Sequence, residues 1–104
     1  MSRLDRINRE LRVQISTIIQ QEMSDPRLKF ITITRVSVSA DLKIANVFFT
    51  FLGERTLGPD MHNVLNKAAG YTRKHLGRRI SFKFTPAITF IYDGPNQAES
   101  KIDE

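Results

Sequence analysis

The basic side chains between Met61 and Tyr92 are the residues of this chain best suited to hold a polyanion. This stretch contains no aspartate or glutamate. Its six basic residues are Lys67, Arg73, Lys74, Arg78, Arg79 and Lys83. Lysine and arginine bind phosphate groups through charge and hydrogen bonds, so a run of them without acidic neighbours favours a nucleic-acid partner. A solvated basic face without any partner is the alternative, and the pattern alone leaves both open.

Composition agrees with one small globular domain. The chain has 104 residues, of which 40% are hydrophobic and 26% are charged, and its net charge is +5. The pI of about 10.0 again favours a polyanionic partner. The absence of cysteine excludes disulfides and thiolate chemistry and fits a cytoplasmic protein. We expect no signal peptide and no membrane span, because no apolar run approaches the roughly 20 residues that a bilayer requires.

Catalytic and metal-binding residues are sparse. His62 and His75 are the only histidines, and they fall on different predicted helices. Neither has carboxylates or cysteines at ligand spacing, and no glycine-rich phosphate loop is present. Asp25 and Asp41 are typical of a helix end and a turn. We therefore predict a protein that is not an enzyme and that holds no metal and no cofactor.

The first predicted element is an amphipathic helix over residues Arg3 to Met23. Ser2 and Asp5 have the spacing of a capping box, and Asp25-Pro26 ends the helix. The helix exposes several arginines that could add RNA contacts or simply face solvent. They are Arg3, Arg6 and Arg9.

Strand patterns follow the first helix. Phe30–Val38 and Ile44–Leu52 are rich in β-branched and aromatic residues, and their short connection predicts an antiparallel hairpin. The apolar phase shifts within the first strand, which predicts either a bulge or burial of both faces. Alternation from Ile80 to Tyr92 predicts a last strand, and Pro86 within it predicts a sheet edge or a bulge.

Two helices are predicted between the second and third strands. One begins at Pro59, and the other runs from Tyr71 to Arg79. Ala69-Gly70 lies between them, and a glycine in a helix interior costs about 1 kcal/mol, which favours a kink or turn. The element order is then α-β-β-α-α-β, which predicts an α+β fold with a three-stranded sheet and helices on one face.

This order is that of a single type II KH-like domain, here spanning residues 1–93, with a polar tail at 94–104. KH domains use a GXXG loop between their central helices to hold the nucleic-acid backbone. The chain has Ala68-Ala69-Gly70 at that junction instead. This difference points to a particular group of KH-like proteins.

Several motifs resemble those of the bacterial ribosome-binding factor A family, and they occur in the family's order. The Ala-x-Gly element, which is a kink in that family, is one of them. Asp25-Pro26-Arg27-Leu28 is similar to its helix-terminating motif, and Asp41-Leu42-Lys43-Ile44-Ala45-Asn46-Val47-Phe48 to its signature. Phe48 stands where tyrosine is usual. Pro86 and Tyr92-Asp93 complete the resemblance, which covers nearly the whole chain.

The resemblance implies a non-enzymatic ribosome assembly factor that binds the immature 30S subunit and 16S rRNA. It implies a role in late 16S rRNA maturation, near the 5′ end and the decoding region, and a link to growth in the cold. A GTPase acting on the same subunit is an implied partner, and we expect a cytoplasmic monomer. A generic single-stranded RNA-binding KH module without a ribosomal role is the main alternative. A protein-interaction domain using the open face of the sheet is another.

The predicted RNA-binding site combines the basic residues with the segment around Gly70. Its members are Lys67, Ala68, Ala69, Gly70, Tyr71, Arg73, Lys74, Arg78, Arg79 and Lys83. Gly70 could instead relieve packing between helix and sheet. Phe48 and Tyr71 are the exposed candidates for base stacking. The other aromatic residues fall on alternating strand positions and are assigned to the core; they are Phe49, Phe51, Phe82, Phe84 and Phe90.

Overall fold

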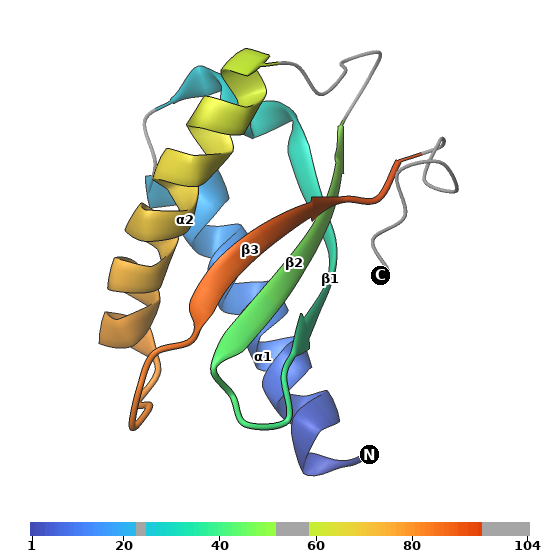
Figure 1. Ribbon diagram of the computed structural model, residues 1–104, viewed down its shortest axis with the longest axis vertical. Helices are drawn as coiled ribbons and strands as arrows, with labels where there is room; N and C mark the ends of the chain where they lie inside the picture. Colours follow the sequence, from blue (N-terminus) through green and yellow to red (C-terminus); the bar gives the residue numbers. More distant parts are fainter. Residues whose placement is uncertain (23–24, 52–58, 95–104) are drawn as a thin grey trace.

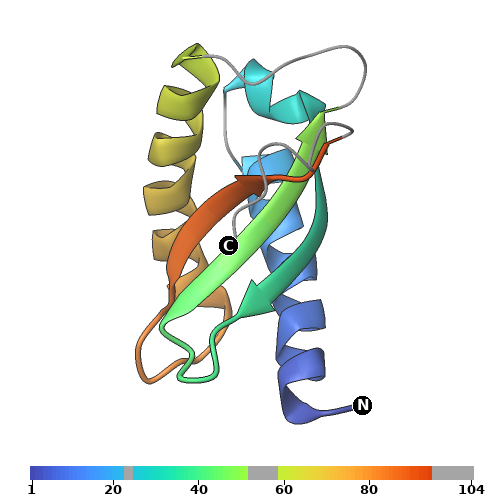
Figure 2. The same cartoon turned by 45° about the vertical axis from the view of Figure 1, so that its right-hand side comes forward.

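The computed structural model describes residues 1–22, 25–51 and 59–94, and within them two α-helices cover one face of a three-stranded sheet (Figure 1). In Figure 2, α1 passes behind the strands and α2 lies alongside β3. The predicted α+β class, three strands and one-sided helix layer are confirmed. Of the predicted tail, 94–104, residues 95–104 lie outside the described residues, as does Met23.

The first helix, α1, spans Arg3–Thr17 and continues as a π-helical turn over Ile18–Glu22. Ser2 and Asp5 form the predicted capping box, in which the Ser2 hydroxyl accepts from the Asp5 amide at 3.0 Å. The helix buries one apolar stripe against the sheet. Its members are Leu11, Ile15, Ile18 and Ile19.

A short 3-10 helix, Pro26–Phe30, leads from α1 into the sheet. The Asp25 carboxylate accepts hydrogen bonds from the Arg27 amide and guanidinium. These bonds lower the pKa of Asp25, and the side-chain bond from Arg27 is the largest cause. Asp25 therefore caps the start of this 3-10 helix, and its extended backbone shows that the first helical segment has ended before it, as predicted.

The sheet has the order β1-β2-β3, and β1 (Ile31–Val38) pairs antiparallel with β2 (Ile44–Phe51). The register shifts between Ile33 and Arg35, so the predicted bulge is confirmed at Thr34. This shift lets residues on both sides of the bulge point into the core, although their sequence phase differs.

Side chains of α1 and of the π-helical turn that follows it hold the two ends of β1. The Asn8 side-chain oxygen accepts from the Val38 amide at 2.8 Å, and the Gln20 side-chain amide donates to the Ile31 carbonyl at 2.7 Å. Because β1 is an edge strand, these bonds satisfy backbone groups that no neighbouring strand reaches.

The third strand, β3, spans Ala87–Tyr92 and runs parallel to β2 at the other edge of the sheet. The edge position predicted from Pro86 is confirmed, but the predicted strand start at Ile80 is wrong. The first ladder bond joins the Ala87 amide to the Lys43 carbonyl, at 2.9 Å. Proline has no amide hydrogen to donate, so pairing begins only after Pro86. Residues 80–86 form a loop instead.

A single helix, α2, spans Pro59–Arg79 and connects β2 to β3. The predicted division into two helices at Ala69-Gly70 is wrong, and the observed order is α-β-β-α-β. The reason is a stripe of buried residues that continues at helical spacing past Gly70. Burial of this stripe offsets the free-energy cost of a glycine in the helix interior. The stripe consists of Val64, Leu65, Ala68, Thr72 and Leu76.

Gly70 faces away from the core, because a Cβ atom built on it meets nothing within 4 Å. We therefore expect Gly70→Ala to stabilise the protein by about 0.5–1 kcal/mol, the difference in helix propensity. The matched control is Ala68→Gly, which lowers propensity and removes a buried methyl group and should destabilise by about 1–2 kcal/mol. Urea unfolding measures both. Destabilisation by Gly70→Ala would support the alternative in which glycine relieves packing.

Candidate nucleic-acid interface

An open groove of about 390 Å³ lies between the outer face of α2 and the loop at residues 80–86. Its lining residues are Gly70, Arg73, Lys74, Gly77, Phe84 and Thr85. The four helical members are spaced by three and four residues, so they share the face of α2 that its buried stripe leaves to solvent. Three of the predicted site residues, Gly70, Arg73 and Lys74, therefore meet in one groove.

The loop is fastened to α2 by Arg73. Its Nε and one terminal nitrogen donate to the Thr85 carbonyl at 3.2 and 3.0 Å. The approach is close at Gly77 as well, where an added Cβ would lie 2.9 Å from the Thr85 hydroxyl oxygen. Arg73 was predicted as a phosphate contact, and the structure gives it a further role in positioning the loop.

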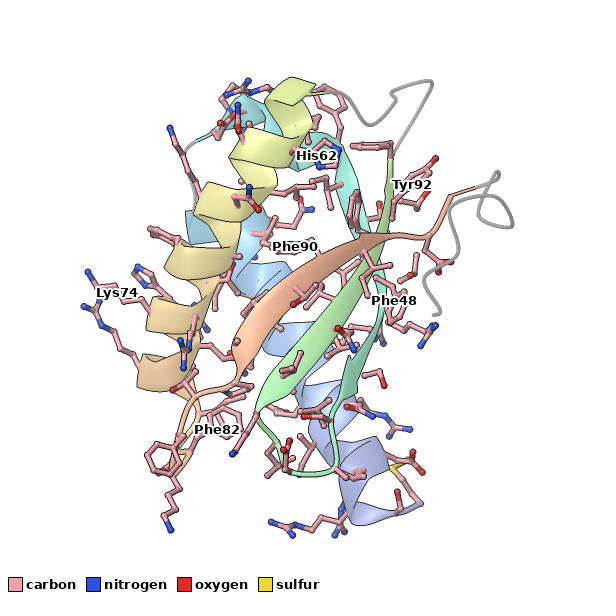
Figure 3. All side chains as sticks on the ribbon, in the orientation of Figure 1. Phe48, His62, Lys74, Phe82, Phe90 and Tyr92 are labelled. Carbon is pink, nitrogen blue, oxygen red and sulfur yellow. The ribbon has the colours of Figure 1, made fainter. Side chains whose placement is uncertain are left out.

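The remaining basic residues extend the positive charge beyond this groove, along α2 and onto the loop. Lys67, Arg78 and Arg79 are exposed on α2, and Lys83 is exposed on the loop. One Arg79 nitrogen donates to the Gln14 side chain of α1 at 3.0 Å. Lys74 projects away from the sheet into solvent (Figure 3). We call the six residues Lys67, Arg73, Lys74, Arg78, Arg79 and Lys83 the basic surface.

The small residues of the predicted site separate in the structure. Ala68 is fully buried, so its assignment to the RNA surface is corrected: its methyl group belongs to the core. Ala69 is half-buried, and Gly70 is exposed. Of the three, Gly70 presents backbone to solvent without any side chain over it.

The two aromatic candidates for base stacking are each partly covered. The Tyr71 ring is half-buried and stacks on His75, with ring centroids 4.0 Å apart. Phe48 lies on the open face of the sheet, where the Arg35 guanidinium sits 3.6 Å from its ring centroid (Figure 3). The sheet thus separates Phe48 from the basic surface.

Phe84 is the residue that sequence reasoning missed. Alternation placed it in the core, yet it is 73% exposed in the groove. The available signal was Pro86, which ends strand pairing before the loop and makes the alternation of the preceding residues irrelevant to burial.

The α1 arginines that were predicted as additional RNA contacts do not line the groove. Arg3, Arg6 and Arg9 are exposed, and Arg3 lines a cavity of about 320 Å³ together with Lys83. Glu10 lines the same cavity, so positive charge is diluted there. Of the three arginines predicted as additional contacts, Arg3 is therefore the one brought near the basic surface.

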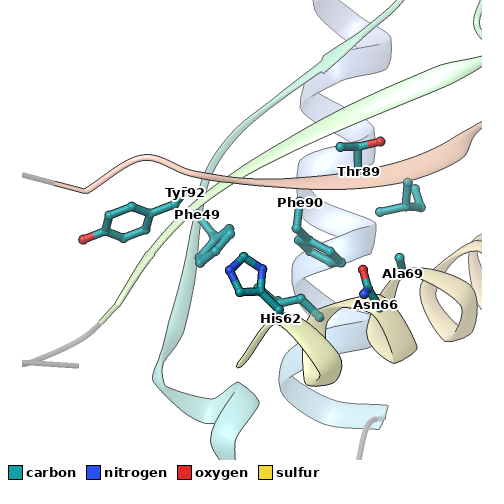
Figure 4. A pocket seen from close by; sticks show the side chains of 9 residues that line it. Phe49, His62, Asn66, Ala69, Thr89, Phe90 and Tyr92 are labelled. Carbon is teal, nitrogen blue, oxygen red and sulfur yellow. The ribbon is translucent and has the colours of Figure 1, made fainter. Parts of the chain in front are cut away.

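A third, smaller pocket of about 220 Å³ lies between α2 and β3 (Figure 4). His62 and Asn66 enter it from α2, and Phe90 enters from β3. The Phe49 ring forms its floor, 6.2 Å from Phe90 between centroids. Residues of α2 line both this pocket and the groove, so the two depressions lie along the same helix.

Within the described ranges no cluster of three or more histidine or carboxylate side chains is placed to hold a metal ion. Asp41 accepts a hydrogen bond from the Ser39 hydroxyl at 2.7 Å, and this bond is the main cause that lowers the pKa of Asp41. It is a turn residue, as predicted. The described helices include none that is long and apolar enough to cross a bilayer.

The fold and the groove define a small α+β binding domain in which one helix supplies both core contacts and an exposed basic face. Comparison with known proteins identifies its family. The family model of ribosome-binding factor A matches residues 3–104. A ribosome-binding factor A from Trichlorobacter lovleyi is 36% identical over 102 residues, which are 98% of this chain and 83% of that protein. The chain belongs to the ribosome-binding factor A family, and the resemblance found in its motifs is confirmed.

Solved structures agree with the fold. The crystal structure of ribosome-binding factor A from Thermus thermophilus matches with a TM-score of 0.74 and 22% identity, over 86% of this chain and 93% of that one. A homology model of the Thermus thermophilus factor, fitted into a cryo-EM map of a 30S–factor complex, matches with a TM-score of 0.66 and 24% identity. That match covers 81% of this chain and 88% of the other.

The role of Arg73 in holding the loop can be tested with its charge retained. Arg73→Lys keeps the positive charge but loses the two-pronged bond to the Thr85 carbonyl. We expect it to lower the free energy of unfolding by about 0.5–1 kcal/mol and to speed amide hydrogen exchange at residues 84–87. Lys74→Arg is the control, because Lys74 is an exposed cation on the same helix face. Equal exchange rates in the two variants would show that Arg73 does not position the loop.

Proposed function

We propose that this chain is a non-enzymatic assembly factor that binds the 30S subunit and its 16S rRNA through the basic surface. It would assist late maturation of that RNA, in the cytoplasm and as a monomer. The observation that carries the proposal is the exposure of all six cations of the basic surface in a stretch without acidic residues. Family membership supplies the ribosomal context, and the Thermus thermophilus relative has been placed in a 30S complex.

Binding would be mainly electrostatic. The cations of the basic surface neutralise phosphates and release condensed counterions, which makes affinity fall steeply with salt. Gly70 adds a place where a phosphate can approach the helix backbone, because an added Cβ there would point into open space. Such contacts hold the RNA backbone without reading its sequence. Ribosomal specificity would then come from the shape of the immature subunit.

The finer architecture is part of this proposal. A hairpin, a helical crossover and a parallel last strand are the parts expected of a type II KH-like domain. We propose that Ala68-Ala69-Gly70 takes the place of the GXXG loop. Here it would act from within a continuous helix, with Gly70 as the exposed member.

Three further expectations stay predictions from the resemblance. They are a role near the 5′ end and decoding region of 16S rRNA, a link to growth in the cold, and a GTPase partner that acts on the same subunit.

Co-sedimentation with separated small subunits, large subunits and intact ribosomes, across a salt series, tests the function. We expect salt-sensitive binding to free small subunits only. Equal binding to all three would favour the generic single-stranded RNA module. Binding that does not respond to salt would favour the protein-interaction alternative, in which the open face of the sheet carries the contact.

The basic surface is tested by removing one exposed cation. Lys74→Ala should weaken binding to small subunits and reduce the slope of log affinity against log salt by about one unit, as expected for one lost phosphate contact. Arg35→Ala is the control, because Arg35 lies on the opposite, open face of the sheet. A slope unchanged by Lys74→Ala but reduced by Arg35→Ala would place the RNA on the open face of the sheet.

A further inference from the structure

Phe84 is unusual among the apolar residues that reach solvent. Among the described residues, five large apolar side chains are exposed, and Phe84 is the aromatic one and the most exposed, at 73%. The others are Met1, Leu4, Val13 and Ile44. A single exposed aliphatic residue is common on protein surfaces, whereas an exposed aromatic ring in a charged groove is typical of nucleic-acid binding.

The ring lies among groups that suit a nucleotide. It shares the groove with Gly70 and Lys74, and the Lys83 ammonium lies 5.8 Å from its ring centroid. Within a few residues, the groove thus combines cations, an open stretch of helix backbone and one exposed ring. Phosphates are attracted to the cations, and a base has a flat apolar surface that matches the ring.

The loop that carries Phe84 is held at its next two residues. The Thr85 carbonyl accepts both Arg73 bonds, and Pro86 is fully buried. The Ala87 amide then begins the strand by donating to the Lys43 carbonyl. A ring presented from a fixed backbone loses little conformational entropy when a ligand stacks on it.

We propose that Phe84 is a stacking site for one unpaired nucleobase of the bound RNA, with the adjoining phosphates held near Gly70 and Lys74. The inference rests on the proposed function and adds that the RNA is single-stranded at this point, because paired bases do not expose their faces. An anionic membrane is disfavoured, since membrane binding requires several apolar anchors and the groove offers one. An acidic protein would use the cations but has no comparable need for an exposed flat ring.

The test uses the full chain and an eight-nucleotide single-stranded RNA that carries one 5-iodouridine. Phe84→Leu keeps an apolar side chain and removes the aromatic face, while Phe84→Tyr keeps the ring. We expect Phe84→Leu to weaken binding about tenfold and Phe84→Tyr to change it less than twofold. Val13→Ala is the control, an exposed apolar residue on α1, and should bind like the parent chain. Irradiation should crosslink the iodouridine to Phe84, and an RNA duplex of equal length should compete poorly.

The inference is overturned if Phe84→Leu binds the single strand as tightly as the parent chain, or if the crosslink maps elsewhere. In that case Lys74→Ala still separates the failure of the stacking site from the failure of the proposed function. Retained salt-dependent binding to small subunits, weakened by Lys74→Ala, would leave the proposed function standing without the stacking site. Absence of salt-dependent binding to small subunits would overturn the proposed function itself. Equal affinity for duplex and single-stranded RNA also overturns the inference, because stacking on Phe84 requires an unpaired base.

Discussion

The packing of α2 against the sheet is the contact on which the rest of this structure depends. One stripe of the helix is buried from Val64 to Leu76 without a break, and it includes the fully buried Ala68. Because helical residues three and four apart share a face, burial of this stripe directs Gly70, Arg73 and Lys74 to the outside. The same helix carries the chain from β2 to a parallel β3, and thereby fixes where the loop at 80–86 must cross.

The groove follows from that crossing. The loop returns beneath the end of α2, where Gly77 permits close approach and Arg73 holds the Thr85 carbonyl. The exposed ring of Phe84 and the cation of Lys74 are brought together as a consequence. Core packing and the proposed RNA contact therefore use two faces of one helix. A substitution on the outer face can change binding while the buried face maintains the fold.

Local signals predicted much of the fold. The capping box at Ser2, the helix end at Asp25, the bulge near Thr34 and the edge position of β3 each depend on residues close in sequence, and all were confirmed. Their physical causes are hydrogen bonds and backbone restrictions that act within a few residues. A short window of sequence contains all of that information.

Tertiary contacts explain what the sequence did not predict. The low helix propensity of Gly70 favours an interruption of the helix. Burial of the residues before and after Gly70 outweighs this free-energy cost, and α2 continues. Ala68 was assigned to the RNA surface, whereas helical phase places it in the core. Alternation assigned Phe84 to a buried strand, but the missing amide of Pro86 ends the pairing first. The basic surface was predictable as a set, since charge is a property of composition. The meeting of Arg73 and Lys74 with Phe84 in one groove required the fold.

Hydrogen–deuterium exchange of this chain, free and bound to small ribosomal subunits, tests the central claim most directly. The claim is that the outer face of α2 and the following loop contact RNA while the open face of the sheet does not. It predicts slower exchange on binding at residues 70–87 and unchanged exchange in β1 and in the turn before β2. Protection of β1 and that turn, with residues 70–87 unchanged, would contradict it.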